Sequence, residues 1–266
     1  MGTNVALVTG ASRGVGRGVA VALGAAGWQV WVTGRSSTRH GSTSHLPGTV
    51  EKTADAVTVA GGVGVAVVCD HRDDAQTRSL VQRIEAESGS LRLLVNNVWG
   101  GYERLNAGGW TEWTAPFWQQ PIHLWESMFD AGVRAHYVTT ALCADLLRRT
   151  AGSAVVTVSM EVGSAHDPRH GVLYSMAKAA DDRFALAVAV ALREAGVASV
   201  ALHPGLVRTE GVMQFAEHLD LAASESPQGV GRVVAALAAD TQLLELSGQA
   251  LTVRELAERY GVDPGP

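Results

Sequence analysis

The sequence predicts an α/β fold in which a doubly wound parallel β-sheet carries helices on both faces. Short apolar runs alternate with longer helical patterns along the 266 residues, and such runs are typical of parallel strands that are buried on both faces. The first run also leads directly into a glycine-spaced turn and a helix, V-A-L-V-T-G-A-S-R-G-V-G at residues 5–16. No linker and no internal repeat interrupts this pattern, so we expect one domain over residues 1–266.

The composition argues against several classes of function. A formal net charge of -5 and a pI of about 6.0 provide no basic surface for nucleic acid or for an anionic membrane. No apolar run approaches the roughly 18 residues of a membrane span, so we expect a soluble, cytoplasmic protein. Cys69 and Cys143 form no paired motif and the histidines form no metal-binding cluster, so we expect neither a disulfide nor a bound metal.

The glycine turn after the first strand is typical of a pyrophosphate site. Its glycines let the backbone turn sharply and approach a ligand closely. The helix that follows, residues 17–26, directs free N–H groups and the positive end of its dipole toward the same place. An ordinary strand-to-helix connection can have the same spacing, so other residues must decide. The turn residues that we expect at the ligand are Gly10, Ser12, Arg13, Gly14, Val15 and Gly16.

The second strand, residues 29–33, ends at Gly34-Arg35 and indicates which dinucleotide is preferred. An acidic residue at this place binds the ribose 2′-hydroxyl of NAD, whereas an arginine accommodates the 2′-phosphate of NADP. Arg35 stands here and Arg13 lies in the glycine turn, so two guanidinium groups can meet a phosphate that carries about -1.5 to -2 charge. Each arginine alone could be a solvated surface residue. Together they predict NADP(H) in preference to NAD(H).

The next segments bring polar residues to the ends of two further strands. Residues 36–48 are predicted to form a mobile surface loop, and a helix over residues 49–60 leads to a third buried strand at residues 63–68. Asp70 follows this strand. It could accept a hydrogen bond from an adenine amino group or act as the N-cap of a helix over residues 73–87. A fourth strand, residues 92–95, runs into Asn96-Asn97.

A tryptophan-rich stretch follows the fourth strand. It is longer than an ordinary strand-to-helix loop, and long loops in compact domains tend to be functional. It could wall an apolar substrate pocket, or it could be a packed surface loop or a subunit contact. Its tryptophans are Trp99, Trp110, Trp113, Trp118 and Trp125.

The remaining elements continue the alternation of helices and strands. A helix over residues 124–149 is predicted to bury one apolar face, and Tyr174 and Lys178 lie in a later helix over residues 172–195. The apolar face consists of Trp125, Phe129, Val133 and Tyr137 at four-residue spacing. Strands are predicted at residues 153–159, 197–203 and 247–253, the last contributing to subunit packing, and residues 206–223 are predicted to form a mobile lid.

Tyr174 and Lys178 form the strongest candidate for proton transfer. Four residues apart, they share one face of a helix. A phenol titrates near about pH 10, which is too high for efficient proton transfer at neutral pH. An ammonium group about 4 to 5 Å away favours the phenolate by roughly 3 to 4 kcal/mol, which would lower the pKa by about 2 to 3 units. Tyr174 is therefore predicted to be a proton donor or acceptor beside a nicotinamide.

These motifs together resemble the short-chain dehydrogenase/reductase family. The resemblance rests on T-G-A-S-R-G-V-G at 9–16, Asp70, Asn96-Asn97, Y-S-M-A-K at 174–178 and Pro204-Gly205, in this order. It implies a single-domain Rossmann fold with a seven-stranded sheet of order 3-2-1-4-5-6-7, usually in a homodimer or homotetramer. The implied activity is hydride transfer between NAD(P) and a carbonyl or alcohol. The stretch A-G-V-R-A-H-Y at 131–137 is similar to the dehydrogenase/reductase member-one branch and its bacterial relatives.

The resemblance also implies roles for single residues. Tyr174 would be the general acid/base, and Lys178 would lower its pKa and bind the nicotinamide ribose. Asn96 would help to fix the fourth strand and the cofactor channel. Thr209 would bond the nicotinamide carboxamide. The residues implied to lie around the nicotinamide are Pro204, Gly205, Val207 and Thr209.

Two positions depart from the family pattern. The family serine is the second residue of a pair that here reads Ser159-Met160, and neighbouring residues on a strand face opposite sides. Ser159 could be catalytic only if the strand end is bulged or its register slips; Ser164 is a weaker candidate. Gly132 stands where the family has an asparagine, although a glycine within a helix costs about 1 kcal/mol relative to alanine. A water molecule could fill that space, or the glycine could permit close packing.

The sequence therefore predicts an NADP(H)-dependent oxidoreductase that acts on an apolar carbonyl or alcohol substrate, with Tyr174, Lys178 and Ser159 as candidate catalytic residues. The alternative is a catalytically impaired protein that binds NADP(H) as a sensor or scaffold. A methyltransferase-like domain would use a similar glycine turn, but the spacing of Tyr174 and Lys178 and the Asn96-Asn97 pair argue against it.

Overall fold

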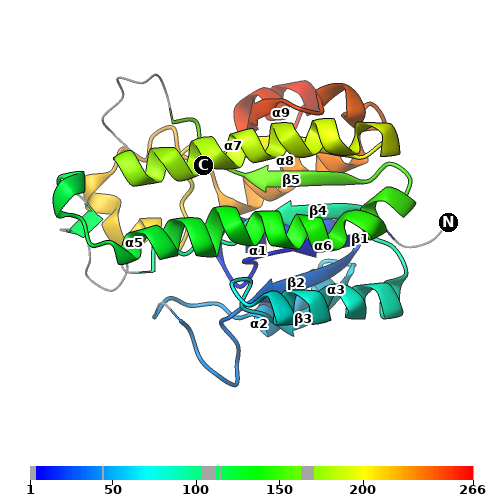
Figure 1. The fold of residues 1–266 in the computed structure, drawn as a ribbon, viewed down its shortest axis with the longest axis horizontal. Helices are drawn as coiled ribbons and strands as arrows, with labels where there is room; N and C mark the ends of the chain where they lie inside the picture. The colour runs from blue at the N-terminus through cyan, green and yellow to red at the C-terminus, as the bar shows by residue number, and fades with distance from the viewer. Residues whose placement is uncertain (1–3, 44, 104–111, 114, 163–170, 266) are drawn as a thin grey trace.

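The computed structural model describes residues 4–43, 45–103, 112–113, 115–162 and 171–265. Its centre is a seven-stranded sheet in the order β3-β2-β1-β4-β5-β6-β7, and all neighbouring strands of this sheet are parallel (Figure 1). The strands are β1 Val5–Val8, β2 Gln29–Gly34, β3 Val63–Val68, β4 Leu93–Asn96, β5 Ala154–Val158, β6 Ala198–His203 and β7 Ala250–Thr252. The strand order and the parallel pairing confirm the predicted fold class.

Helices cover both faces of this sheet. One face carries α1 Gly14–Ala25, α2 Val50–Val59, α8 Pro227–Ala239 and α9 Val253–Tyr260, and the other carries α3 Asp74–Ser88, α6 Ala135–Arg149 and α7 Val172–Leu192. Figure 1 shows α6 and α7 running across the same face. Alternate residues of β1 point into opposite layers, since Ala6 and Val8 join the first apolar core while Val5 and Leu7 join the second.

The helix predicted over residues 124–149 is a continuous run of helical residues with three parts. It begins with α5 His123–Trp125, continues as the π-helical segment η3 Glu126–Arg134 and ends as α6. A π-helix bonds each N–H to the carbonyl five residues back, so the spacing of side chains differs from that of an α-helix. The short 3₁₀ helices are η2 Phe117–Gln119, η5 Arg193–Ala195, η6 Val212–His218 and η7 Leu243–Leu246.

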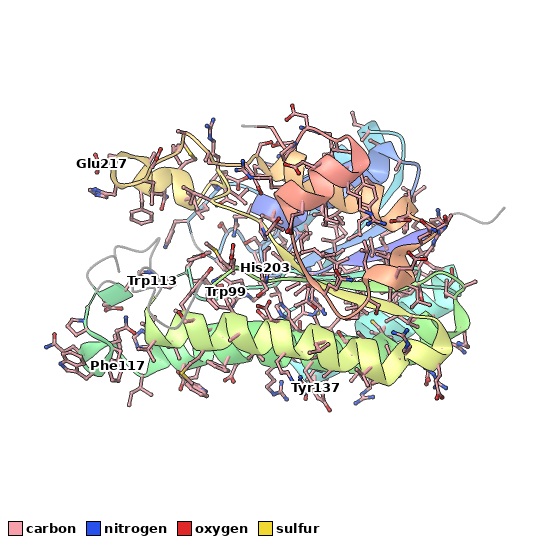
Figure 2. All side chains as sticks on the ribbon, turned by 90° about the horizontal axis from the view of Figure 1, so that it is seen from above. Trp99, Trp113, Phe117, Tyr137, His203 and Glu217 are labelled. Atoms are coloured by element: carbon pink, nitrogen blue, oxygen red, sulfur yellow. The ribbon has the colours of Figure 1, made fainter. Side chains whose placement is uncertain are left out.

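The predicted apolar face of this helix is confirmed at Phe129 and Val133, which are partly buried against the cluster around Met128 and Tyr174, and is wrong at its other two positions. Trp125 is 45% exposed and Tyr137 is 62% exposed. Figure 2 shows Tyr137 pointing away from the body of the molecule. Met128, Gly132 and His136 are buried instead. Four-residue spacing therefore identified the helix but only part of its inner face.

Two expectations near the third strand are corrected. β3 lies at the edge of the sheet, so it is not fully buried, and Val63 and Val68 at its ends are exposed. Asp70 does not cap the following helix. Asp73 is the N-cap of α3 and accepts hydrogen bonds from the next turn, whereas the carboxylate of Asp70 accepts hydrogen bonds from Arg72.

Both cysteines are free thiols buried in the second apolar core. Burial raises the pKa of the Cys69 thiol to about 11 and that of the Cys143 thiol to about 12. None of the helices in the described part of the chain combines the length and the apolar character that crossing a membrane requires.

Candidate active site

A cavity of about 560 Å³ lies at the carboxyl ends of the strands. The strand order reverses here between β1 and β4, which is where ligands bind in open α/β sheets. The predicted site residues that line it are Gly10, Ser12, Arg13, Gly14, Val15, Arg35, Ser159, Tyr174, Lys178, Pro204, Gly205, Val207 and Thr209. Gly16, Asp70 and Asn96 are not among its described lining residues. Residues 206–223, predicted to form a lid, contribute Leu206, Val212, Phe215 and Leu219.

The glycine turn forms one end of the cavity. Gly10 and Gly14 have positive φ angles of 64° and 57°, a conformation that favours glycine. A Cβ on Gly16 would lie 2.6 Å from the carbonyl oxygen of Gly10, so only glycine fits where the turn closes on itself. Asn97 Nδ2 donates to the carbonyl oxygens of Thr9 and Gly10, at 3.0 Å each. Asn97 therefore ties the turn to the end of β4.

Asn96 has a different role from its neighbour. Its side chain is fully buried, and Nδ2 donates to Thr140 Oγ1 at 2.9 Å and to Thr157 Oγ1 at 3.5 Å. These contacts hold β4 against β5 and α6, in agreement with the expected support of the fourth strand. The residue that secures the glycine turn is Asn97, to which the family resemblance assigns no separate role.

Carboxylates stand at the two places where the sequence predicts phosphates. Glu210 Oε2 accepts a hydrogen bond of 2.8 Å from the backbone N–H of Gly14, at the amino end of α1. Glu103 forms an ion pair with Arg35. A helix amino terminus and a guanidinium group both favour anions, so each carboxylate occupies a place suited to a ligand phosphate.

The two arginines of the cofactor end differ in their contacts. The guanidinium of Arg13 donates to Ser36 Oγ, Ser42 Oγ and the carbonyl oxygen of Pro47, at 2.8, 2.9 and 3.0 Å. Arg13 therefore holds together the loop over residues 36–48. Arg35 reaches the cavity beside Glu103. Burial lowers the pKa of both arginines, in Arg35 with help from the charge of Arg72.

Tyr174 lies near the start of α7 in an aromatic cluster. Its Oη is 3.2 Å from Tyr102 Oη and donates to Met160 Sδ at 3.4 Å. The rings of Trp99 and Trp113 contact the phenol ring edge-on, at centroid distances of 5.6 and 5.7 Å. Figure 2 shows Trp99 and Trp113 on the inner side of the long helices. Burial raises the pKa of Tyr174 well above its ordinary value, and Tyr102 and the charge of Asp181 raise it further.

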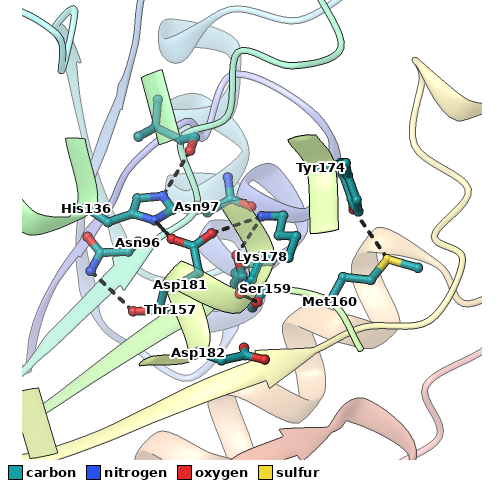
Figure 3. Close-up of polar contacts among 12 residues, drawn as sticks. Asn96, Asn97, His136, Thr157, Ser159, Met160, Tyr174, Lys178, Asp181 and Asp182 are labelled. Carbon is teal, nitrogen blue, oxygen red and sulfur yellow. Dashed lines mark hydrogen bonds and ion pairs between the residues drawn. The ribbon is translucent and has the colours of Figure 1, made fainter. Parts of the chain in front are cut away.

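The pKa of Tyr174 is therefore raised overall in this arrangement, contrary to the lowering expected from Lys178. Lys178 Nζ donates to Asp181 Oδ2 at 3.2 Å (Figure 3) and to the carbonyl oxygen of Val158 at 3.3 Å. It also lies 4.0 Å from the ring centroid of Trp99. The positive charge of Lys178 is thus largely balanced by Asp181. The helix spacing placed the two side chains one turn apart, but it did not reveal this competing anion.

Asp181 and His136 form a buried pair beneath Lys178. Asp181 Oδ1 lies 2.8 Å from His136 Nδ1, and the two side chains are 0% and 1% exposed. His136 Nε2 lies 2.9 Å from the carbonyl oxygen of Val98, which can only accept, so Nε2 carries a proton and donates. Burial alone would raise the pKa of Asp181, but His136 and Lys178 hold it below its usual range. The pair fixes the position of Lys178 from below.

Sequence reasoning missed this pair, although part of its signal was present. Lys178 and Asp181 are three residues apart in α7, a spacing that places opposite charges on one helix face. His136 comes from α6 and meets Asp181 only because α6 and α7 pack side by side. No spacing along the chain indicates that contact.

Gly132 makes room for an aromatic ring. A Cβ at this position would lie 2.9 Å from Cε3 of Trp99. The space beside the helix is therefore filled by the indole of Trp99, which favours the close-packing interpretation over a water molecule. The packing partner is a side chain of the loop after β4 and not a neighbouring helix.

Ser159 is turned away from Tyr174, which corrects its expected catalytic placement. Its backbone N–H continues the sheet by donating to the carbonyl oxygen of Leu202, so the strand end is regular. Its hydroxyl is buried and donates to the backbone carbonyl oxygen of Lys178 at 3.1 Å. Met160 stands beside the phenol instead (Figure 3). Ser164 lies outside the described residues.

The tryptophan-rich stretch has two different parts. Trp99 and Trp113 line the cavity, as the pocket-wall interpretation expects. Trp118 is exposed beside Phe117, and Trp125 stacks on Phe129 at a centroid distance of 4.1 Å. Trp110 lies outside the described residues. Of the four tryptophans of this stretch that the structure describes, Trp99 and Trp113 are the ones that can contact a ligand in the cavity.

Three features are typical of an oxidoreductase of the dinucleotide-binding class. They are the order of the parallel sheet, the glycine turn after β1, and a tyrosine and a lysine one helical turn apart in α7. A sequence model of the short chain dehydrogenases matches residues 4–220. The chain belongs to the short-chain dehydrogenase/reductase family.

Two curated relatives match nearly the whole chain. This chain is 37% identical over 273 residues to "Dehydrogenase/reductase SDR family member 1" of Mus musculus, and the match covers 97% of this chain and 82% of the relative. It is also 34% identical over 277 residues to the Homo sapiens protein of the same name, and that match covers 98% of this chain and 83% of the relative. Both matches agree with the branch that the sequence indicated.

Solved structures share the fold. A short chain dehydrogenase from Mycobacterium thermoresistibile has a TM-score of 0.82 at 23% identity, covering 97% of this chain and 88% of that one. A 3-oxoacyl-[acyl-carrier protein] reductase from Brucella melitensis, in complex with NAD, has a TM-score of 0.79 at 22% identity, covering 95% and 96%. These similarities show the same seven-stranded architecture.

Proposed function

We propose that this protein is an NADP(H)-dependent oxidoreductase that transfers a hydride between the nicotinamide and an apolar carbonyl or alcohol substrate. The observation that carries the proposal is the position of the Tyr174 hydroxyl. It lies in an apolar cavity, one helical turn from Lys178, and the glycine turn forms the other end of the same cavity. Membership of the family supports the reaction type.

The cavity fits a dinucleotide at its phosphate positions. The Gly14 N–H and Arg35 already bind carboxylates, so anions are accommodated at both places. We infer that Gly14 N–H would hold the pyrophosphate and that Arg35 would hold the 2′-phosphate. Pro204, Gly205, Val207 and Thr209 would line the nicotinamide end, as the family resemblance implies. Asp70, already bonded by Arg72, would remain beside the adenine end.

The residues of the chain have separate tasks in this proposal. When bound, the nicotinamide supplies or accepts the hydride. Tyr174 Oη gives its proton to the carbonyl oxygen during reduction and takes it from the alcohol during oxidation. Lys178 stabilises the phenolate that proton donation leaves behind, and Asp181 keeps the ammonium group in place. Trp99, Trp113 and Met160 exclude water and favour an apolar substrate.

The test is NADPH oxidation across a panel of alkyl and aryl aldehydes and ketones. Tyr174→Phe is expected to lower kcat by about 10³-fold, within the range of general acid catalysis, because it removes only the proton donor. Tyr137→Phe is the matched control, because its phenol lies on the outer surface of α6. Full activity of Tyr174→Phe would contradict the assigned role.

A second candidate is an NADP(H)-binding sensor or scaffold with impaired catalysis. The balanced charge of Lys178 and the raised pKa of Tyr174 favour it. This candidate predicts that NADPH binds with a micromolar or lower Kd in calorimetry while wild-type protein turns over no member of the panel.

We also propose a homodimer or homotetramer of one domain, residues 1–266. Leu186 and Val190, exposed on α7, support an association surface, as does the edge position of β7. Sedimentation of the full chain tests this proposal, since a monomer at micromolar concentration would contradict it.

A further inference from the structure

We propose that Tyr102 supplies a second hydroxyl group to the active site and, together with Tyr174, hydrogen-bonds the carbonyl oxygen of the substrate. This inference rests on the proposed carbonyl–alcohol chemistry and goes beyond it by assigning a further catalytic residue. Tyr102 lies on the loop after β4, among the residues that line the cavity.

The geometry of the two phenols carries the inference. Their oxygens are 3.2 Å apart, and their rings are inclined by 29° at a centroid distance of 6.4 Å. The two hydroxyl groups therefore converge on one point of the cavity. A third oxygen can lie about 2.7 Å from both, and a carbonyl oxygen can accept two hydrogen bonds.

The end of β5 does not provide this hydroxyl group. The side chain of Met160 lies beside Tyr174, but its thioether has no proton to donate. The hydroxyl of Ser159 is committed to the backbone of Lys178. Tyr102 approaches Tyr174 from the loop after β4, a different element from the one that carries Met160.

The local sequence explains how Tyr102 reaches this place. A Cβ on Gly100 would lie 2.7 Å from the carbonyl oxygen of Ser127, and one on Gly101 would lie 2.8 Å from the ring of Trp99. The two glycines thus let the chain fold back over its own tryptophan. The Tyr102 ring then packs against Trp99 and Trp113, at centroid distances of 6.1 and 5.5 Å.

The two tyrosines have different tasks. In reduction, the hydride adds to the carbonyl carbon, the C=O π bond breaks, and the carbonyl oxygen takes the proton of Tyr174. Tyr102 keeps its proton and stabilises the developing negative charge on that oxygen. Burial raises the pKa of Tyr102, so its hydroxyl stays protonated at neutral pH. Tyr174 is assigned the acid role because it is the phenol that lies one helical turn from the Lys178 ammonium group.

The test compares Tyr102→Phe with Tyr137→Phe, a matched loss of one phenolic oxygen at an exposed position. Tyr102→Phe is expected to lower kcat by about 10²- to 10³-fold, the effect of losing one donor to a developing oxyanion, with the NADPH Kd within twofold of wild type. Tyr137→Phe is expected to keep the wild-type kcat.

A second variant adds a hydroxyl group at the neighbouring position. In the Tyr102→Phe background, Met160→Ser is expected to restore kcat at least tenfold, because a hydroxyl group would replace the thioether side chain that contacts Tyr174. If Tyr102 had only a structural role, Met160→Ser would not restore kcat in this background.

Three outcomes would overturn the inference. A kcat of Tyr102→Phe within threefold of wild type would show that its hydroxyl is not used, while the proposed function would stand. If Ser159→Ala lowered kcat by about 10²-fold while Tyr102→Phe left kcat unchanged, the second hydroxyl group would be that of Ser159. NADPH binding without turnover by wild-type protein would remove the proposed function and this inference with it.

Discussion

The two ends of the cavity are built in different ways. At the cofactor end, the glycine turn and the end of β2 form the predicted phosphate sites, and both lie within residues 10–35. At the catalytic end, the environment of Tyr174 comes from three elements: the loop after β4, which carries Tyr102 72 residues earlier, the end of β5 and the helix α7. A site made by local backbone conformation shows its pattern in the sequence, whereas a site made by converging side chains does not.

The charges at the two ends also differ. The cofactor end offers cations and N–H groups that are occupied by the exchangeable carboxylates Glu103 and Glu210. At the catalytic end, Lys178 is paired with a carboxylate that cannot leave, because Asp181 is buried on the same helix. The first arrangement can exchange one anion for another, and the second holds its cation in a constant position.

The largest effect is expected from breaking the buried pair at the catalytic end. Asp181→Asn replaces the carboxylate by a neutral amide and so removes the anion that pairs with Lys178 and His136. Losing one partner of a buried pair typically costs about 3 to 5 kcal/mol, so the free energy of unfolding at pH 7 should fall by that amount. Urea unfolding measures it, and Asp145→Asn, a change on the exposed face of α6, is the control.

The pH dependence of this loss has a definite sign. The pKa of Asp181 is held below its usual value of 3.8 in the folded protein. Its ionised form therefore stabilises the fold above about pH 5, and this contribution disappears as the pH falls below 3.8. The difference in unfolding free energy between wild type and Asp181→Asn should shrink on acidification. A constant difference down to pH 3 would contradict the assigned role of the carboxylate.

A smaller effect is expected where the loop after β4 packs against the π-helical segment. Gly132→Ala would place a Cβ against Trp99 and should lower the free energy of unfolding by about 1 to 2 kcal/mol, as overpacking does. In a Trp99→Ala background the same change should stabilise the protein by up to about 1 kcal/mol, because alanine favours the helix. Thermal unfolding of the four proteins measures both values. Equal effects in both backgrounds would contradict the contact.

At the cofactor end, Arg35→Ala is expected to weaken NADPH binding at least tenfold while NADH binding changes little. The reason is that Arg35 would contact only the 2′-phosphate, which NADH lacks. Calorimetry with both nucleotides measures the two Kd values, and Arg78→Ala on the exposed side of α3 controls for the loss of charge. We expect wild-type protein to bind NADPH at least tenfold more tightly than NADH, and equal constants would contradict the proposed preference.

The smallest effect is expected from Glu210→Gln. Removing the carboxylate that competes for the Gly14 N–H should tighten the binding of NADPH and NADH equally, by roughly threefold, since a charge that remains partly in contact with solvent contributes about 1 kcal/mol or less. Glu217→Gln, an exposed change in the same segment (Figure 2), is the control. A selective gain for one nucleotide would show that Glu210 acts at a different part of the ligand.

Short patterns predicted the strands, the glycine turn and the start of α7 well. Each depends on neighbouring residues, such as the apolar run of β1 that leads into Gly10. The failures have one physical cause. A helix cap was one of the two interpretations of Asp70, but Asp73 provides that cap, and β3 was expected to be buried although it is an edge strand. Both the residue that caps α3 and the burial of β3 depend on what lies beside the element in space.

The sequence by itself determined the fold class and the family, because the alternating apolar runs and the motifs are local patterns. It also contains the residues that we propose to approach the phosphates. Only the tertiary structure decided the surroundings of Tyr174. It brought Met160 and Tyr102 to the phenol, turned Ser159 away and set Asp181 and His136 beneath Lys178. The reason is that the protonation and charge of a buried group depend on every polar atom within a few ångströms, and those atoms come from separate parts of the chain.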